Sequence, residues 1–382
     1  MGEKEKVVLI GPVYPYKGGI AHYTSLLYRA LIKKYEVKLI SYKMQYPKFL
    51  FKKEQRDYSN DLFKIDETEF LINTANPFNI LSVSHIINKE NPKFVIIQWW
   101  HPYFSPCYSI LLSGLKKSIK VIFTCHNVIP HERFPFDKLL TKIVLKRGDG
   151  FIVQSKKDER DLLSIKPNAI EKCTPLPTYN AFKLRDISKK QAVEEIIEKD
   201  HFDVNYDIPL LLFFGFVREY KGLKYLLEAM PLVLEKLPDC KLLVVGSFGD
   251  DKVDYIEQIN EHGINDNVFL KDDYTPDNEV EKYFAACDLV VLPYEDATQS
   301  AIVQIAFGFE KPCVVTKVGG LPDVVSDHLT GFVVEPRDIQ GISEAIIEYF
   351  KNDYTEKMHL AIQEEEKRFS WEHMVDVISK LL

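Results

Sequence analysis

The sequence lacks the marks of several protein classes. None of its 382 residues falls in a run of the roughly 18 to 20 uncharged apolar residues that span a bilayer. The amino-terminal segment MGEKEKVVLIGP is a charged tip followed by one short strand, not a secretory signal. The six cysteines are scattered and include no Cys-x-x-Cys pair, so a disulfide framework is not indicated. These absences predict a cytoplasmic protein with reduced thiols.

Cofactor and metal motifs are also missing. The glycine-rich stretch near the amino terminus does not have Gly-x-Gly-x-x-Gly spacing, so it is not a nicotinamide or flavin fingerprint. His131 and Glu132 do not have the spacing of a zinc-binding helix, and no two aspartates are separated by a single residue. We therefore expect neither a cofactor nor a metal. Because the formal net charge is −7 and no recognised motif is present, nucleic-acid binding is not expected either.

What the sequence does contain is a repeated alternation of short apolar strands and amphipathic helices. Strand candidates include KFVIIQWW and KVIFTCHN in the first half, and IPLLLFFGF and LVVLPY in the second. This alternation predicts an α/β fold of two doubly wound, Rossmann-like domains with parallel sheets. The expected domains are 1–185 and 186–369, joined through a polar stretch from Pro175 to Asp207. Trp371, in the amphipathic tail 370–382, is expected to pack that tail back on one domain, in the simplest case the first.

The two halves of the chain carry charges of opposite sign. Residues 1–180 contain 28 Lys and Arg against 17 Asp and Glu, whereas the remainder contains 21 against 39. A basic half indicates an anionic partner or substrate, and two solvated surfaces that happen to differ are the alternative. Within this half, residues 42–56 mix aromatic residues with basic ones, among them Lys48, Lys52 and Lys53. Such a mixture seats a segment on an anionic membrane; an ordinary packed loop is the alternative.

Polar motifs fall where strands are expected to end, and open parallel sheets bind ligands outside the carboxyl ends of their strands. After the first strand, Gly18 and Gly19 let the backbone turn tightly ahead of a helix start, whose N–H groups favour phosphate. An ordinary turn is the alternative. At the matching corner of the second domain, Arg218 and Lys221 can both approach one diphosphate. The alternative is a surface pair beside Glu219.

A third corner joins an apolar strand at 289–294 to a helix at 300–309. Thr298, Gln299 and Ser300 bring hydroxyls and an amide to the amino terminus of this helix, where we expect a second contact to an oxyanion. Capping of the helix by Thr298 or Ser300 is an alternative that does not exclude binding.

His126 ends a buried strand in the stretch FTCHN. At such an edge an imidazole can donate to a sugar hydroxyl or meet a developing charge.

Together these motifs resemble those of the GT-B glycosyltransferases, specifically family 4, the group 1 glycosyl transferases. The resemblance covers nearly the whole chain and is most specific where FGFVREYKGLKYLLEA, ACDLVVLPY and KPCVVTKVGGLPDVVSDHLTGFVVEP follow one another in the family's order. It implies two facing Rossmann-like domains with a deep interdomain cleft, the first for an acceptor and the second for a nucleotide-diphosphate sugar. It also implies a metal-independent, retaining hexosyl transfer (EC 2.4) to a saccharide or lipid-linked saccharide in cell-surface polysaccharide synthesis. Such an enzyme would be cytoplasmic or peripheral at the inner face of the cell membrane.

By position, the resemblance places Gly18 and Gly19 near the donor phosphate or the acceptor, and His126 beside the donor sugar. Arg218 and Lys221 would hold the diphosphate and, with His126, carry the catalysis.

The chain departs from the family pattern at two places. Phe216 stands where relatives commonly have an arginine, so the role of Arg218 rests on its reach. The family's two glutamates, separated by seven residues, are missing because Ala297 and Ile305 occupy those positions. The ATQS version resembles a subgroup in which polar side chains and helix N–H groups contact the donor.

Three residues could replace the missing carboxylates. Glu295 or Asp296 would supply a displaced carboxylate, and Gln304 lies next to the second glutamate position. Two other functions stay open. A nucleotide-sugar epimerase of the same fold would process the donor without an acceptor, and a non-catalytic nucleotide-binding relative would bind it without turnover.

Overall fold

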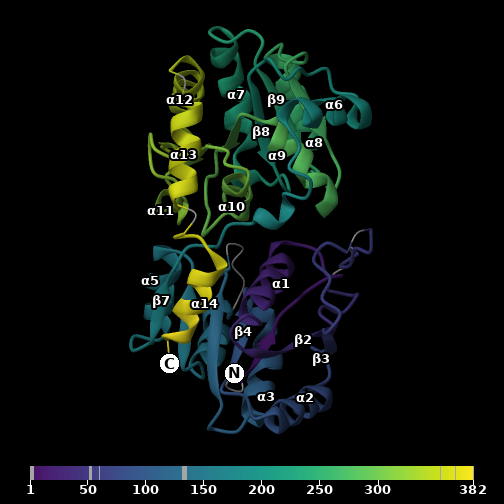
Figure 1. Cartoon of the computed structure of the whole chain (residues 1–382), viewed down its shortest axis with the longest axis vertical. Helices are drawn as coiled ribbons and strands as arrows, with labels where there is room; N and C mark the ends of the chain where they lie inside the picture. Colours follow the sequence, from purple (N-terminus) through teal and green to yellow (C-terminus); the bar gives the residue numbers. More distant parts are fainter. Residues whose placement is uncertain are drawn as a thin grey trace. The chain divides into compact units, whose positions relative to one another are not determined.

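The structure is a computed structural model that describes residues 4–50, 54–59, 61–130, 136–352, 354–365 and 367–381. The chain forms two compact units, one of Met1–Pro175 with Ser370–Leu382 and the other of Leu176–Phe369 (Figure 1). The expected boundary after residue 185 therefore falls inside the second unit. No helix in the described ranges is both long and apolar enough to cross a membrane.

The first unit is built on a seven-stranded sheet in which all neighbouring strands run parallel, in the order β3-β2-β1-β4-β5-β6-β7. Its elements are β1 (Lys6–Ile10), α1 (Gly19–Leu31), β2 (Glu36–Met44), β3 (Glu69–Asn73), α2 (Pro77–Glu90), β4 (Phe94–Trp99), α3 (Ser105–Gly114), β5 (Lys120–Cys125), α4 (Asp137–Leu145), β6 (Gly150–Val153), α5 (Lys156–Ile165) and β7 (Glu171–Cys173). The strand order reverses between β1 and β4, so the carboxyl ends of these two strands form the topological switch point of this sheet.

The central strands are buried on both faces, as a parallel sheet covered by helices requires. Every residue of β4 and β6 is buried, whereas the edge strands β3 and β7 are partly exposed. The last helix, α14 (Trp371–Ser379), packs on α1 of this unit, and Figure 1 shows it in yellow among purple and blue elements. Lys33 Nζ donates to Glu372 at 2.6 Å, and the ring of Trp371 lies 5.1 Å from that of Tyr23.

The second unit has a six-stranded parallel sheet in the order β10-β9-β8-β11-β12-β13. Its elements are α6 (Lys189–Asp200), β8 (Leu210–Phe214), α7 (Leu223–Leu234), β9 (Lys241–Val245), α8 (Lys252–Glu261), β10 (Val268–Lys271), α9 (Val280–Ala286), β11 (Leu289–Leu292), α10 (Ala301–Gly308), β12 (Cys313–Thr316), α11 (Leu321–Val324), β13 (Gly331–Val334), α12 (Ile339–Lys351) and α13 (Thr355–Glu365). Here the order reverses between β8 and β11, which makes the carboxyl ends of these strands the switch point.

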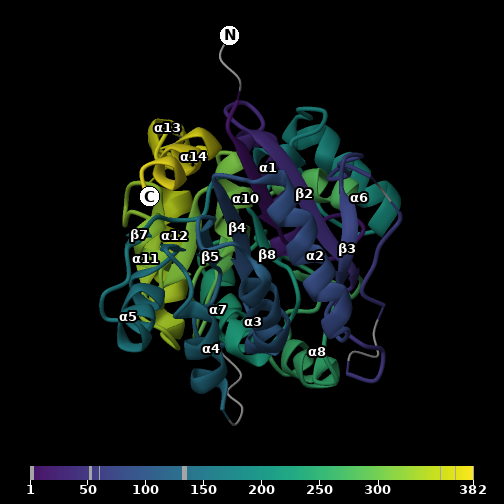
Figure 2. The ribbon, with the colours of Figure 1, turned by 90° about the horizontal axis from the view of Figure 1, so that it is seen from below.

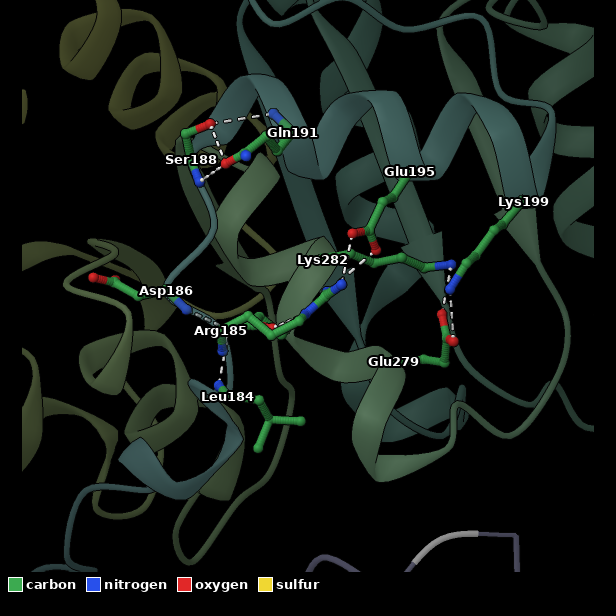
Figure 3. A network of polar contacts seen from close by, with 10 residues as sticks. Leu184, Arg185, Asp186, Ser188, Gln191, Glu195, Lys199, Glu279 and Lys282 are labelled. Carbon is green, nitrogen blue, oxygen red and sulfur yellow. Dashed lines mark hydrogen bonds and ion pairs between the residues drawn. The ribbon is translucent and has the colours of Figure 1, made fainter.

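The polar stretch expected as a linker is part of the second unit, where α6 packs against α9. The buried carboxylate of Glu281 on α9 accepts from the backbone N–H groups of Leu184, Arg185 and Asp186 at 2.8, 2.7 and 3.1 Å. Arg185 Nε donates to the same carboxylate at 2.8 Å, and its two terminal nitrogens donate to Glu195 on α6 at 2.7 and 3.2 Å (Figure 3). This network fastens the segment ahead of α6 to the second unit.

The alternation of strands and helices predicted from the sequence is confirmed. KFVIIQWW and KVIFTCHN form β4 and β5, and IPLLLFFGF and LVVLPY form β8 and β11. The pattern did not predict β3, β7 and β13, each of which lies at an edge of its sheet.

Candidate active site

In the second unit the chain turns sharply after β8, through a short 3-10 helix (η3, Glu219–Lys221) into α7. Gly222, between the two helices, has φ +66°, and a Cβ there would lie 2.0 Å from the carbonyl oxygen of Pro293, just beyond β11. Only glycine allows this conformation so close to another backbone. The turn therefore holds Arg218 and Lys221 beside the switch point between β8 and β11.

Arg218 and Lys221 place two positive charges at this turn. Within the residues described, neither side chain forms an ion pair; Arg218 Nη1 donates to the carbonyl of Val217 at 3.0 Å, and Lys221 Nζ lies 5.7 Å from the ring centre of Tyr294. Burial, and then the neighbouring charge of Arg218, lower the pKa of Lys221 to about 8. An ammonium group destabilised in this way gains from an anion placed beside it.

The corner between β11 and α10 is held by two glycines that follow β12. A Cβ on Gly319, which has φ +53°, would lie 1.8 Å from the carbonyl oxygen of Ala297. A Cβ on Gly320 would lie 2.0 Å from Nε2 of Gln299, and Gly320 N donates to the carbonyl of Thr298 at 2.9 Å. The positions of residues 297–299 therefore depend on the glycine pair in the next strand connection.

Ser300 occupies the N-cap of α10 but does not cap it. Its side chain makes no hydrogen bond to the first turn, and it lies instead against the hydroxyl of Tyr294, where Ser300 and Thr298 are both buried. A helix start without a side-chain cap presents N–H groups with partial positive charge. This end of α10 can therefore accept an anion.

The two corners of the second unit meet around Gly215, which has φ +100°. A Cβ built on Gly215 would lie 3.2 Å from Lys221 Nζ and 3.6 Å from Cδ1 of Ile302 in the first turn of α10. The structure thus brings together the cations and the uncapped helix that the sequence placed at separate corners. The short distances from Gly215 to Lys221 Nζ and to the first turn of α10 put both within reach of one diphosphate.

Glu295 is engaged in ion pairs. Its carboxylate accepts from Arg337 Nη2 at 2.5 Å and lies 3.3 Å from Lys224 Nζ. Burial acts to raise the pKa of Glu295, but Arg337 and Lys224 lower it overall. Its negative charge is thus balanced within the protein. Asp296 follows it and is partly exposed.

Gln304, the residue next to the second glutamate position, lies inside the second unit. It is fully buried, its carbonyl oxygen accepts from Tyr179 N at 3.2 Å, and its Oε1 accepts from the hydroxyl of Thr178 at 3.4 Å. Gln304 therefore fixes the segment at the start of the second unit to α10.

In the first unit, Gly18 is the N-cap of α1 with φ +104°, no side chain caps the helix, and Gly19 opens it at an exposed position. The loop before it is braced by residues that the sequence did not indicate. Lys17 N donates to the carbonyl of Gln55 at 3.0 Å, and Arg56 Nη2 donates to the hydroxyl of Tyr16 at 3.2 Å. The end of the 42–56 segment thus supports the Gly-Gly loop.

The rest of the 42–56 segment is divided between core and surface. Tyr46 packs on Phe104 at 5.3 Å and accepts from the indole N–H of Trp100 at 3.2 Å, whereas Phe49 and Leu50 are exposed. Lys52 and Lys53, expected to contact a membrane, lie outside the described residues.

His126 lies in a buried polar and aromatic cluster at the carboxyl ends of β4 and β5. Its Nε2 donates to Oε1 of Gln98 at 2.7 Å, and its ring lies 4.7 Å from that of Tyr23, which in turn contacts Trp371. Burial lowers the pKa of His126 to about 4, so the imidazole is neutral near pH 7. The sequence did not indicate Gln98, Tyr23 or Trp371 as its neighbours, because they come from three distant segments.

Across the ranges that the structure describes, no group of three or more His, Cys, Asp or Glu side chains is arranged to hold a metal ion. His131 and Glu132 lie outside those ranges.

The chain resembles known glycosyltransferases in both units. Residues 17–177 match the model for Glycosyltransferase Family 4, and residues 195–368 match the model for Glycosyl transferases group 1. An uncharacterized glycosyltransferase of Methanocaldococcus jannaschii is 28% identical over 188 residues, which are 47% of this chain and 46% of that protein. A D-inositol 3-phosphate glycosyltransferase of Corynebacterium diphtheriae is 30% identical over 168 residues, 42% of this chain and 39% of that protein. The match thus spans less than half the length of these curated relatives.

A solved structure supports the assignment of the fold. HepE from Anabaena, in complex with UDP and glucose, superposes with a TM-score of 0.73 at 16% identity, covering 99% of this chain and 100% of that one. At this identity the likeness concerns the fold alone. Since the two family models together account for nearly the whole of both units, the chain belongs to the group 1 glycosyltransferases of family 4, with the GT-B fold.

Proposed function

We propose that this chain is a retaining glycosyltransferase that moves a hexosyl group from a nucleotide-diphosphate sugar to a hydroxyl of a saccharide or lipid-linked saccharide, in the synthesis of a cell-surface glycan. The observation that carries the proposal is the pair of cations, Arg218 and Lys221, at the switch point of the second unit. Two cations without an acidic partner in the described part of the chain, beside an uncapped helix start, fit a diphosphate.

The proposed reaction uses this arrangement as follows. The bond between the anomeric carbon and the β-phosphate oxygen breaks, and the acceptor oxygen bonds to the same carbon from the same face. The departing phosphate takes the proton of the acceptor hydroxyl, so no nucleophile from the protein is required. Negative charge grows on the diphosphate as the bond breaks, and Arg218, Lys221 and the N–H groups of α10 stabilise that charge in the transition state.

No metal has a role in this scheme, because the cations of the protein supply the counter-charge. A chelator is therefore expected to leave the rate of transfer unchanged. The first unit is assigned to the acceptor, which would approach the backbone at Gly18 and Gly19 where α1 begins. The ion-paired carboxylate of Glu295 is assigned to holding the second unit together, not to the donor.

The names of similar proteins suggest where a search for substrates should begin. Structures of HepE contain UDP and UDP-glucose, so UDP-glucose is the first donor to test. A relative is named D-inositol 3-phosphate glycosyltransferase, so a phosphorylated cyclitol belongs in the acceptor screen beside saccharides.

A thermal-shift screen of UDP, GDP, ADP and their sugars tests the donor site, since a ligand that binds only the folded state raises its stability. A nucleotide should raise the melting temperature of the parent protein but not of Arg218→Ala or Lys221→Ala. Lys241→Ala is the matched control, because Lys241 begins β9 and its ammonium donates to the carbonyl of Asp266. No shift with any nucleotide, or an equal shift in all variants, would refute the proposed donor site.

Product analysis separates the proposal from its two rivals. Transfer to an acceptor supports the transferase. Conversion of the donor sugar without transfer would identify an epimerase. Nucleotide binding without turnover would identify a non-catalytic relative. The second rival is favoured by the lack of glutamate at positions 297 and 305, which are Ala297 and Ile305. We also propose that the enzyme is peripheral at the inner face of the cell membrane, which the basic balance of residues 1–180 supports.

A further inference from the structure

Helix α4 of the first unit exposes an apolar stripe. Phe136, at its N-cap, and Leu139 and Ile143, within it, are 74%, 54% and 46% exposed. Their spacing places them along one side of the helix, one above the other. A helix that packs on a core normally has a polar outer face, so this stripe requires a reason.

The opposite side of α4 is already used for packing. Val144 and Leu145 are fully buried in the core of the first unit. The hydroxyl of Ser105, at the start of α3, donates to the carbonyl of Leu140 at 3.0 Å, and α4 lies beside α3 (Figure 2). The exposed stripe is therefore a preformed surface on a fixed helix.

The stripe is flanked by positive charge. Lys138, Lys142, Lys146 and Arg147 are all exposed, and in the described residues none of them forms an ion pair. The one acidic residue of the helix, Asp137, is buried. The outer face of α4 thus combines large apolar side chains with cations and has no exposed carboxylate of its own.

A helix of the second unit shows that exposed apolar residues are not always accompanied by positive charge. On α8, Val253 and Ile256 are 60% and 40% exposed and three residues apart, but Asp254, Glu257 and Glu261 lie on the same helix. Such a face would be repelled by an anionic surface. The combination found on α4, with exposed cations and no exposed acid, is therefore absent from α8.

We propose that this face of α4 binds an anionic membrane surface. The rings and aliphatic chains of the stripe enter the headgroup region, and the lysines pair with lipid phosphates. The inference rests on the proposed function in one respect: binding to a membrane would bring the enzyme to a lipid-linked acceptor. The exposed cations and the lack of an exposed acid on the helix make this face complementary to anionic lipid, which favours lipid over a protein partner.

Flotation of the full-length protein with vesicles tests the proposal. The parent protein is expected to float with vesicles that contain phosphatidylglycerol, less so as salt is raised, and to stay behind with vesicles of phosphatidylcholine alone. Replacing Lys138, Lys142 and Lys146 together by glutamine should lower the partition coefficient roughly a hundredfold, about fivefold for each cation. Leu139→Ser with Ile143→Ser should lower it at least tenfold, whereas Val253→Ser with Ile256→Ser should leave it unchanged.

Three results would overturn the proposal. The first is that the parent protein does not float with anionic vesicles. The second is that the α4 variants float as well as the parent protein, whereas the Phe49→Ser, Leu50→Ser variant does not float. The third is that the parent protein is a dimer, held by the stripe, which Leu139→Ser with Ile143→Ser dissociates. Nucleotide thermal shifts in the same variants keep the two proposals apart. If α4 is a membrane surface, these shifts persist when flotation is lost, whereas failure of the donor site would abolish the shifts and leave flotation intact.

Discussion

Replacing Glu281 by alanine should release the segment ahead of α6 from the second unit. The carboxylate is fully buried and accepts three backbone N–H bonds and one from Arg185. Hydrogen bonds to a charged group contribute about 1.5 to 3 kcal/mol each, but the released N–H groups regain water. The free energy of unfolding should therefore fall by about as much as on breaking one buried ion pair, which is about 3 to 5 kcal/mol. The lower end of this range is expected because Arg185 is half-exposed.

Urea unfolding and limited trypsin digestion measure this effect. In Glu281→Ala the unfolding midpoint should fall, and cleavage after Arg185 should accelerate because the segment is no longer held. Glu195→Ala is the matched control, since it removes only the outer fork to the same arginine. An ion pair that is partly exposed contributes about 0 to 1 kcal/mol, so this variant should stay near the parent.

The effect should also depend on pH. Burial acts to raise the pKa of Glu281, but the N–H groups and the charge of Arg185 lower it overall. A lowered folded-state pKa means that the stabilisation is present above the unfolded pKa and is lost as pH falls through the folded pKa. Glu281→Gln should therefore remove part of the acid sensitivity of the second unit. If Glu281→Ala is cleaved no faster than Glu195→Ala and loses less than about 1 kcal/mol, the reasoning is refuted.

Three further predictions concern the candidate site. In calorimetric titrations, nucleotide affinity should be constant up to about pH 7 and decline above about pH 8, where Lys221 loses its proton. Lys221→Arg should abolish this decline, and an unchanged affinity of the parent protein at about pH 9.5 would contradict the prediction. Gly319→Ala should lower nucleotide affinity at least tenfold because its methyl group collides with Ala297, whereas Gly263→Ala, also at positive φ but in open space, should lower stability alone. The pKa of His126 in the folded state is about 4, below its unfolded value, so protonation favours the unfolded state. In denaturant titrations the free energy of unfolding of the first unit should therefore fall by up to about 3 kcal/mol between pH 6.5 and pH 4. An equal fall in His126→Gln would show that another group is responsible.

The fold could be predicted from the sequence wherever strands are buried on both faces. Such strands are continuous apolar runs, as in β4 and β8, and they stand out from the amphipathic helices around them. The strands that the pattern missed, β3, β7 and β13, lie at sheet edges and are short and partly exposed. These three edge strands bury few side chains, so their residues do not form the apolar run by which the central strands are recognised.

The sequence predicted where the candidate site lies along the chain, but not the contacts that hold its residues in place. Arg218 and Lys221 follow a recognisable strand, and in parallel sheets that position alone indicates a ligand. The contacts of Gly319 with Ala297, and of Arg337 with Glu295, join residues that are distant in sequence. No local pattern contains such contacts, because they arise only when separate β-α-β units pack together.

The discontinuity of the first unit has a consequence for biosynthesis. Chains leave the ribosome from the amino terminus at about 5 to 20 residues per second, so β1 to β7 emerge first and the whole second unit follows before α14 is made. Until then the ring of Tyr23 lacks Trp371, and α1 lacks the helix that packs on it. The nascent first unit therefore keeps an uncovered helix until α14 has been made, and a frameshift or stop codon shortly before residue 370 would leave that unit without the helix that packs on α1.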